Sequence, residues 1–306
     1  MKTLRTIVAA ALVGIGLSLP AQAEDVTFAL GMDVAYAPFY LAKERGIFEK
    51  HGLNVTILQF ANGGEGIDAV AAGQAQVGAA AEQTTMFRMG RGLDLRPITI
   101  YEKSGDYIKL VARPGIEDAK DIKTFGVVKG SASEYSTNLT MQKFGMDPAS
   151  VKIVYSGPPE LPALLARGDI DGYFAWEPWP SLGIKQGGKA ILTSGDVGYS
   201  YTMWLTVSGE WLDQNRATAQ QIIDVLTEVN AEIVADPQKA ADDFQKATKQ
   251  PAADTIGFMK STDWTVRPFN EEDFASFDKI VDFMVAQKIT DTPVDFRAAM
   301  EKGRMN

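Results

Sequence analysis

Residues 26–60 read VTFALGMDVAYAPFYLAKERGIFEKHGLNVTILQF and contain a complete pattern of strand, helix and strand. Residues 26–30 form a short apolar run typical of a buried strand. Pro38 suits the first turn of the helix that follows, and Gly46 suits its C-terminal end. Residues 54–60 then alternate side chains of different polarity for most of their length, as a half-buried strand does. This order of elements predicts α/β layers with a largely parallel sheet.

The same alternation continues along the chain and begins a second time near residue 125. From Trp211 onward the pattern is mainly helical, with apolar residues at helical spacing in residues 222–233 and 274–284. The remaining strands are expected at residues 77–81, 95–101, 107–112, 125–128, 151–155, 172–176, 190–192 and 203–207, and the remaining helices at residues 67–72, 85–89, about 134–144 and 161–166.

The composition excludes several classes of function. Among 306 residues, 30 Lys and Arg stand against 39 Asp and Glu, which gives a formal net charge of −9. Because phosphate binding needs a basic surface, nucleic acid is not an expected partner. The chain has no cysteine, so it can form no disulfide, thiolate metal site or iron–sulfur cluster. The single histidine, His51, lies beside Gly52 at an expected helix end, where a cation is favourable without any catalytic role.

The first 23 residues have the pattern of a secretory signal peptide. Lys2 and Arg5 precede an uncharged apolar run, and the small residues before position 24 fit a cleavage site after Ala23. The run is too short to predict a membrane span, and a signal anchor that is not cleaved is the alternative interpretation. A lipoprotein anchor needs a cysteine at the cleavage site, and the chain has none. We therefore expect an exported protein that is free in its compartment, which for a bacterial chain is the periplasm.

The motifs of common enzymes are absent from the sequence. There is no Gly-x-Ser-x-Gly elbow, no Walker A loop and no dinucleotide fingerprint, and the glycines of residues 63–66 have the wrong spacing for either nucleotide loop. The acidic residues Glu271, Glu272 and Asp273 follow Asn270, an arrangement that helix capping explains without any chemistry. We expect no catalytic residue, no metal site and no cofactor.

Two loops, in contrast, have the composition of sites that bind small solutes. Ligands of open α/β sheets lie beyond the carboxyl ends of strands, at helix N-termini. Residues 129–135 (KGSASEY) occupy such a place, where free amides and serine hydroxyls can bind an anion. Capping of the helix by a serine explains the same residues without a ligand, and the sequence leaves both interpretations open. Residues 82–85 (EQTT) follow another expected strand with similar polar groups.

Residues 176–180 (WEPWP) form the second notable loop, with two tryptophans around a carboxylate just after an expected strand. An indole wall with one buried charge can hold a cationic or amphipathic group. A packed turn of aromatic core residues is an equally good interpretation, because tryptophan is mostly buried in any fold.

Several of these segments, taken in order, resemble one known family. The chain is similar to the periplasmic solute-binding proteins of ABC importers, in the branch that takes up nitrate, taurine and aliphatic sulfonates. A related branch binds pyrimidine precursors of thiamine. The segments that carry the resemblance are APFYLAKERGIF (37–48) with HGL (51–53), AVAAGQAQVG (69–78), KGSAS (129–133), LPALLARGDIDGYFAW (161–176) and WEP (176–178).

The resemblance implies the type II periplasmic binding protein fold, with two α/β lobes joined by a hinge and a ligand cleft between them. It places lobe 1 at residues 24–110 and, mostly helical, at residues 206–306, with lobe 2 at residues 111–205. The two strands that cross between the lobes are expected near residues 109–113 and 203–207.

For lobe 1, the resemblance implies three ligand-binding residues. Tyr36 precedes the first helix and is expected to face the cleft, and Gln83 and Thr84 are expected to supply hydrogen bonds. Tyr199 and Tyr201, on the return path of the chain, are weaker candidates.

For lobe 2, the resemblance implies five more residues. Ser131, Ala132 and Ser133 are expected to bind an oxyanion through hydroxyls and amides. Trp176 is expected to form a wall, and Glu177 to pair with an ammonium if the ligand is a zwitterion such as taurine, although a glutamate in such a turn often only stabilises the hinge.

The expected function is therefore capture of a small oxyanion or zwitterion and its delivery to the membrane permease of an ABC importer, by a monomer. An oxyanion is favoured over a pyrimidine because the serine loop replaces the glycine-rich loop expected of pyrimidine binders, and the cysteine-rich iron motif of the eukaryotic enzymes of that branch is missing. A thiamine-precursor binder, an exported enzyme with Glu177 as base, and a ligand sensor that signals to a membrane receptor remain as alternatives.

Overall fold

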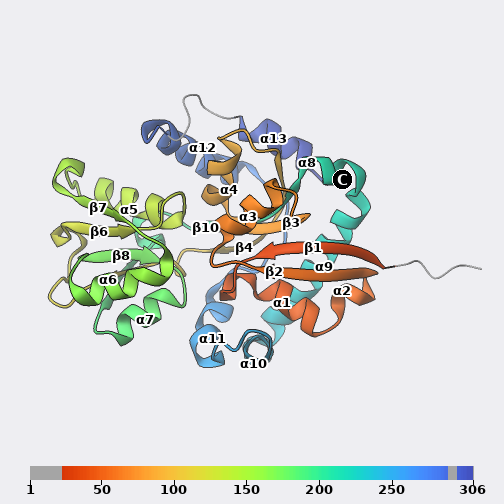
Figure 1. Ribbon diagram of the computed structural model, residues 1–306, viewed down its shortest axis with the longest axis horizontal. Coiled ribbons are helices and arrows are strands. Elements are labelled where there is room, and N and C mark those ends of the chain that lie inside the picture. The colour runs from red at the N-terminus through yellow and green to blue at the C-terminus, as the bar shows by residue number, and fades with distance from the viewer. Residues whose placement is uncertain (1–22, 289–294, 306) are drawn as a thin grey trace, which may run out of the picture.

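The computed structural model describes residues 23–288 and 295–305, and this part of the chain forms two mixed five-stranded sheets surrounded by helices (Figure 1). We call the sheet with strands β1–β4 and β10, together with its helices, lobe 1. Lobe 2 is the sheet with strands β5–β9 and its helices. The predicted α/β fold is confirmed.

The sheet of lobe 1 has the strand order β2-β1-β3-β10-β4. Its β1 lies between β2 and β3 and is parallel to both, whereas β10 is antiparallel to β3 and β4. The strands are β1 (Glu24–Leu30), β2 (Leu53–Gln59), β3 (Val77–Ala81), β4 (Leu95–Ser104) and β10 (Tyr201–Ser208).

The sheet of lobe 2 has the order β7-β6-β8-β5-β9 and repeats this plan. Its β6 is parallel to β7 and β8, and β5 is antiparallel to β8 and β9. In each sheet four of the five strands run in the same direction and only one, β10 or β5, is antiparallel to its neighbours, so the predicted largely parallel sheet is confirmed. Each reversed strand lies next to an inter-lobe connection. The strands are β5 (Lys109–Ala112), β6 (Thr124–Val127), β7 (Lys152–Tyr155), β8 (Gly172–Ala175) and β9 (Lys189–Thr193).

Helices from both ends of the chain cover lobe 1, whereas the middle of the chain covers lobe 2 (Figure 1). Lobe 1 contains α1 (Ala37–Glu44), α2 (Ile47–Lys50), α3 (Gly63–Ala71), α4 (Glu82–Met89), α8 (Gly209–Gln214), α9 (Arg216–Ala235), α10 (Pro237–Thr248), α11 (Ala252–Ser261), α12 (Glu271–Ala286) and α13 (Phe296–Gly303). Lobe 2 contains α5 (Ala132–Lys143), α6 (Leu161–Arg167) and α7 (Trp179–Lys185). The short 3-10 turns are η1 (Val34–Tyr36), η2 (Ala119–Asp121), η3 (Pro148–Ser150), η4 (Pro158–Glu160) and η5 (Gly195–Val197).

The core of lobe 1 joins the N-terminal sheet to the C-terminal helices. Trp204 of β10 is fully buried and packs edge-on against Phe269 and Phe277, with ring centroids 5.2 and 4.9 Å away. The apolar residues of α9 that follow the predicted helical spacing are buried, as expected for one face of an amphipathic helix. Asn270 begins α12 with a capping box that it shares with Asp273, which confirms the capping interpretation of the acidic cluster.

The chain passes between the lobes twice, at residues 105–108 and 194–200. The two connections touch each other, since the N–H of Gly195 donates to the carbonyl of Gly105 at 2.8 Å and the N–H of Ser194 donates to the carbonyl of Ile108 at 2.8 Å. The two backbones approach each other at Gly105 and Gly195, where a Cβ added to Gly105 would lie 3.3 Å from the Cα of Gly195. The connections thus form one narrow waist.

This waist lies a few residues before the positions predicted for the crossing strands. Residues 109–112 pair with β8 and β9 inside lobe 2, and residues 203–207 pair with β3 and β4 inside lobe 1. The placement at residues 109–113 and 203–207 was wrong because an apolar run marks a strand but not the sheet that it joins. The predicted lobe boundaries stay a prediction, and we propose from these pairings that they fall within the two connections.

The signal peptide predicted at residues 1–23 lies outside the described residues, except for Ala23. Between residues 23 and 305, leaving out 289–294, no helix has both the length and the hydrophobicity that crossing a membrane requires.

Candidate functional site

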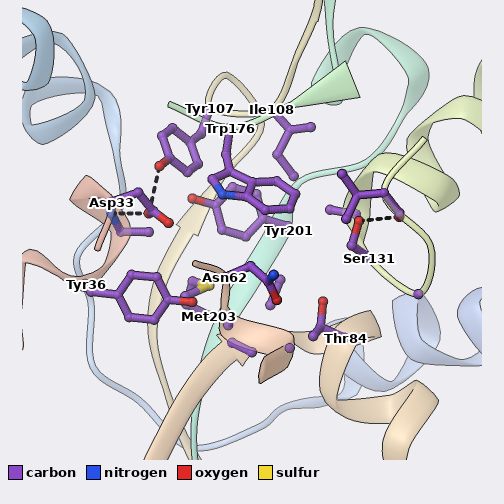
Figure 2. Close-up of a pocket in the computed structure, with 18 of the residues that line it drawn as sticks. Asp33, Tyr36, Asn62, Thr84, Tyr107, Ile108, Ser131, Trp176, Tyr201 and Met203 are labelled. Carbon is purple, nitrogen blue, oxygen red and sulfur yellow. Dashed lines mark hydrogen bonds between the residues drawn. The ribbon is translucent and has the colours of Figure 1, made fainter. Parts of the chain in front are cut away.

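A pocket that is open to solvent lies where the two lobes face each other beside the waist (Figure 2). Residues of both lobes and of the connection at 105–108 line it. They are Asp33, Ala35, Tyr36, Asn62, Gly63, Gly64, Ala80, Ala81, Thr84, Arg88, Tyr107, Ile108, Val128, Lys129, Gly130, Ser131, Ala132, Trp176, Tyr201 and Met203.

Three helices begin at the wall of this pocket, each directly after a parallel strand. Asn62 and Gly63 begin α3 after β2, Thr84 lies in the first turn of α4 after β3, and Ser131 and Ala132 begin α5 after β6. The N–H groups of a first turn have no helical carbonyl to bond, and the positive end of the helix dipole lies there. The pocket is therefore suited to hydrogen-bond acceptors and negative charge at several points of its wall.

The hydroxyls of Ser131, the N-cap of α5, and of Ser133, in its first turn, both bond protein groups. The Ser131 Oγ accepts the N–H of Ser133 at 3.1 Å and donates to the carbonyl of Val128 at 2.8 Å. The Ser133 Oγ accepts the N–H of Val128 at 3.1 Å, and Ser133 is fully buried away from the pocket lining. The Ser131 hydroxyl thus caps α5, and the Ser133 hydroxyl joins the helix to Val128, the residue after β6. The N–H of Ala132, the first residue of α5, has no helical carbonyl to bond, and residues 129–131 line the pocket beside it.

Tyr36, Thr84 and Trp176 lie in the pocket, together with the weaker candidate Tyr201. Trp176 directly follows β8 in lobe 2, and Tyr201 comes from β10 in lobe 1; both line the pocket (Figure 2). The Tyr201 hydroxyl donates to Glu102 Oε1 at 2.7 Å, which fixes the ring. These aromatic side chains give the pocket an apolar middle between polar ends.

Gln83 and Glu177 lie outside the pocket lining. Gln83 is fully buried and its Oε1 accepts the hydroxyl of Tyr199 at 2.7 Å. Glu177 pairs with Lys109 at 2.9 Å and accepts the N–H of Ser181 at 3.2 Å. Both side chains hold the region around the waist together, and neither reaches the space where a ligand fits.

The sequence did not indicate several pocket residues, above all Asp33. Its side chain is only 7% exposed, and its Oδ1 accepts the Tyr107 hydroxyl at 2.8 Å and the N–H of Ala35 at 3.0 Å. Burial raises the pKa of Asp33 to about 7, against the lowering effect of these hydrogen bonds. The available signal was the position of Asp33 in the loop after β1, where ligand residues of α/β sheets are found. Asn62, Arg88, Tyr107, Ile108 and Met203 were missed as well, whereas Lys129 belongs to the loop that the sequence indicated.

Two further carboxyl groups are buried beside the pocket. Glu82, at the start of α4, accepts the N–H of Thr202 at 2.7 Å, and burial raises its pKa to about 8. Glu102 accepts the hydroxyl of Tyr201, and burial raises its pKa well above the usual range. Each carboxyl holds a residue of β10 close to where the chain enters lobe 1.

The glycine at the start of α3 is required by close packing. A Cβ on Gly63 would collide with the Tyr36 hydroxyl and lie 3.0 Å from the Cβ of Ala80 and 3.1 Å from the carbonyl of Ala79. We expect Gly63→Ala to move Tyr36, to lower ligand affinity at least tenfold and to cost roughly 1–3 kcal/mol of unfolding free energy. Titration calorimetry and urea unfolding test this.

Gly257→Ala is the matched control, because a Cβ there meets no atom within 4 Å and the residue lies inside helix α11. Affinity in Gly63→Ala equal to that of Gly257→Ala would contradict the role given to this contact.

The arrangement is that of a binding pocket. Within the part of the chain that the structure describes, no group of three or more His, Asp or Glu side chains is placed to hold a metal ion. The polar groups of the pocket are helix N-termini, hydroxyls, the amide of Asn62, the cations of Arg88 and Lys129, and the carboxylate of Asp33, and these can fix and orient a small charged solute.

Two α/β lobes around a ligand-sized pocket, joined by a double connection, define the fold of the periplasmic binding proteins. The chain belongs to the NMT1/THI5-like family, whose model matches residues 33–240. The resemblance found in the sequence is thereby confirmed.

Known relatives are binding proteins for small anions and sulfonates. The taurine-binding periplasmic protein of Escherichia coli is 28% identical over 180 residues, which cover 58% of this chain and 56% of that protein. Among solved structures, the alkanesulfonate-binding protein SsuA of Xanthomonas axonopodis, bound to MOPS, superposes with a TM-score of 0.79 at 18% identity, covering 90% and 98% of the two chains. The periplasmic nitrate-binding protein NrtA of Synechocystis has a TM-score of 0.75 at 16% identity, covering 92% and 86%.

Proposed function

We propose that this protein is the extracytoplasmic solute-binding component of an ABC importer. It captures a small oxyanion or zwitterion of the sulfonate, taurine or nitrate class between its lobes and delivers it to the membrane permease. The observation that carries the proposal is the pocket, which takes its wall from both lobes and from the connection between them. A solute in this place touches both lobes and stabilises their closed arrangement.

The anionic end of the solute is assigned to the start of α5. Ala132 lines the pocket there as the first residue of α5, the helix dipole adds partial positive charge, and Lys129 lines the same pocket. The net charge of −9 does not oppose this assignment, because local amides and dipoles dominate inside a cleft.

We assign direct ligand contact to five of the eight residues predicted from the sequence, namely Tyr36, Thr84, Ser131, Ala132 and Trp176. Gln83, Ser133 and Glu177 are assigned supporting roles, because each is held by protein partners outside the pocket lining.

Binding without catalysis is the second part of the proposal. The relatives are named as binding proteins, and no pair of pocket residues is arranged as nucleophile and base. The names of the relatives and the predicted signal peptide support a periplasmic location.

Binding of a thiamine-type pyrimidine is the second candidate function, because the aromatic middle of the pocket suits a flat ring.

We expect the mature protein, residues 24–306, to be stabilised by one class of ligand in a thermal-shift panel of nitrate, sulfate, taurine, alkanesulfonates and hydroxymethylpyrimidine. A ligand at about 100 times its dissociation constant adds roughly 2.7 kcal/mol, which for a chain of this size raises Tm by about 5–10 °C.

A rise in Tm with an oxyanion or zwitterion supports the importer, provided that mass spectrometry finds the bound compound chemically unchanged after release from the protein. A shift with the pyrimidine alone overturns the ligand class, and turnover of a bound compound overturns the binding role.

A further inference from the structure

Asp33 is the one carboxylate among the residues that line the pocket. Both of its hydrogen bonds within the protein, from Tyr107 and from Ala35, end on Oδ1. The second oxygen, Oδ2, points into the pocket (Figure 2). Asp33 is more than nine-tenths buried, and one of its two oxygens faces the pocket (Figure 2).

Arg88 and Lys129 line the pocket and Lys109 lies close to it, but no contact between any of these three cations and Asp33 is found in the described structure. Arg88 makes hydrogen bonds to both oxygens of Asp68 at 2.7 and 2.8 Å. Lys109 pairs with Glu177, and Lys129 lies over the ring of Tyr155, 5.4 Å from its centroid. A buried carboxylate without a cationic partner is costly, and it repels a simple anion. A ligand that brings its own cationic N–H group removes both penalties.

The carboxylate and the anion-binding amides lie at opposite ends of the pocket. Figure 2 shows Asp33 on the side of lobe 1 and Ser131, beside Ala132, on the side of lobe 2, with Trp176 and Tyr201 between them. The pocket therefore has a negative end, an apolar middle and an end that attracts negative charge.

We propose that the ligand is an ω-amino oxyacid, with its ammonium group on Asp33 Oδ2, its short alkyl chain between Trp176 and Tyr201, and its oxyanion at the start of α5. This inference rests on the proposed function and narrows its ligand class. It also moves the ammonium-binding role from Glu177, where the sequence placed it, to Asp33. The reason is that Glu177 has a lysine partner and Asp33 has none.

The titration of Asp33 supports the same assignment. Because burial holds its pKa near 7, Asp33 is partly protonated in neutral solution, whereas an alkylammonium stays charged. Affinity for an amino-sulfonate should therefore rise with pH from 5.5 to 7.5, by about tenfold or more, and the rise should be absent in Asp33→Asn. The titratable and charged groups that face Asp33 are Tyr36, Tyr40, Tyr101, Glu102, Tyr107, Glu177 and Tyr201.

The experiment compares ligands that differ only in the amino group. Titration calorimetry measures taurine against ethanesulfonate, and homotaurine against propanesulfonate, for the wild-type protein and for Asp33→Asn. In at least one of the two pairs, we expect the wild type to bind the amino-sulfonate about 30-fold more tightly than the sulfonate of the same chain length. We expect Asp33→Asn to lose this preference.

Asp106→Asn is the control. It removes the exposed carboxylate next to Tyr107, in the connection at residues 105–108. This carboxylate is not part of the pocket lining, and we expect the variant to keep the preference for the amino-sulfonate. Thermal unfolding shows that each variant is folded.

The outcomes separate the two proposals. Equal binding of amino-sulfonate and sulfonate by the wild type, or an unchanged preference in Asp33→Asn, overturns the role of Asp33 and leaves the importer standing. Binding of the pyrimidine with no binding of any oxyanion or amino-sulfonate overturns the proposed ligand class, and with it the ω-amino oxyacid.

Discussion

Replacing Trp204 by Ala is expected to lower the unfolding free energy by about 3–5 kcal/mol, the usual cost of removing a buried aromatic side chain. Trp204 is fully buried in β10, where its ring packs against Phe269 and Phe277 and its Nε1–H donates to Thr202 Oγ1 at 2.9 Å. The substitution leaves a cavity between the sheet and the segment that leads into α12. Urea unfolding monitored by far-ultraviolet circular dichroism measures the loss.

Trp176→Ala is the matched control for this prediction. The same side chain is removed, but Trp176 is only partly buried and lines the pocket. We expect it to weaken ligand binding, as the loss of a tryptophan contact generally does, and to cost clearly less stability than Trp204→Ala. Equal stability losses in the two variants would show that the core of lobe 1 does not depend on Trp204 as described.

Raising the pH from 5 to 8.5 is expected to destabilise the unliganded protein, with Glu82 contributing on the order of 3 kcal/mol. The pKa of Glu82 is about 8 in the folded protein, against 4.5 for an ordinary glutamate. The folded state therefore holds a proton that the unfolded state has released. Its stabilising effect is complete below pH 4.5 and is lost as the pH rises through 8.

Urea unfolding of wild type and Glu82→Gln at several pH values measures this contribution. The variant keeps a side chain that can accept the Thr202 N–H and does not titrate, so its stability should fall less steeply with pH. Asp33 and Glu102 shift in the same direction and retain part of the slope. Parallel pH profiles for the two proteins would show that Glu82 is ionised in the folded state.

Local patterns were sufficient to predict most elements of the fold. The strand, helix and strand at residues 26–60 lie where the apolar periodicity placed them, and the spacing in residues 222–233 indicated the buried face of α9. The two connections were misplaced because β5 and β10 have the same apolar composition as other strands. Their membership of a sheet is decided by long-range pairing, which a single sequence does not contain.

The candidate site was predicted to the level of loops but not of single side chains. Trp176 and Glu177 are neighbours after β8, yet only Trp176 reaches the pocket, since consecutive residues leave a strand end in different directions. Thr84 and Gln83 differ in the same way on the first turn of α4. Asp33 became a candidate only when the fold brought Tyr107 and the second lobe against it.

The narrow waist at Gly105 and Gly195 also bears on the affinity of the proposed ligand. A solute held by one lobe alone would make few contacts and dissociate quickly. Because the two touching connections keep the other lobe within reach, its contacts form as an intramolecular step, at an effective concentration in the millimolar range typical of short tethers. In the proposed function, two weak half-sites thereby act as one strong site without any enlargement of the surface that touches the solute.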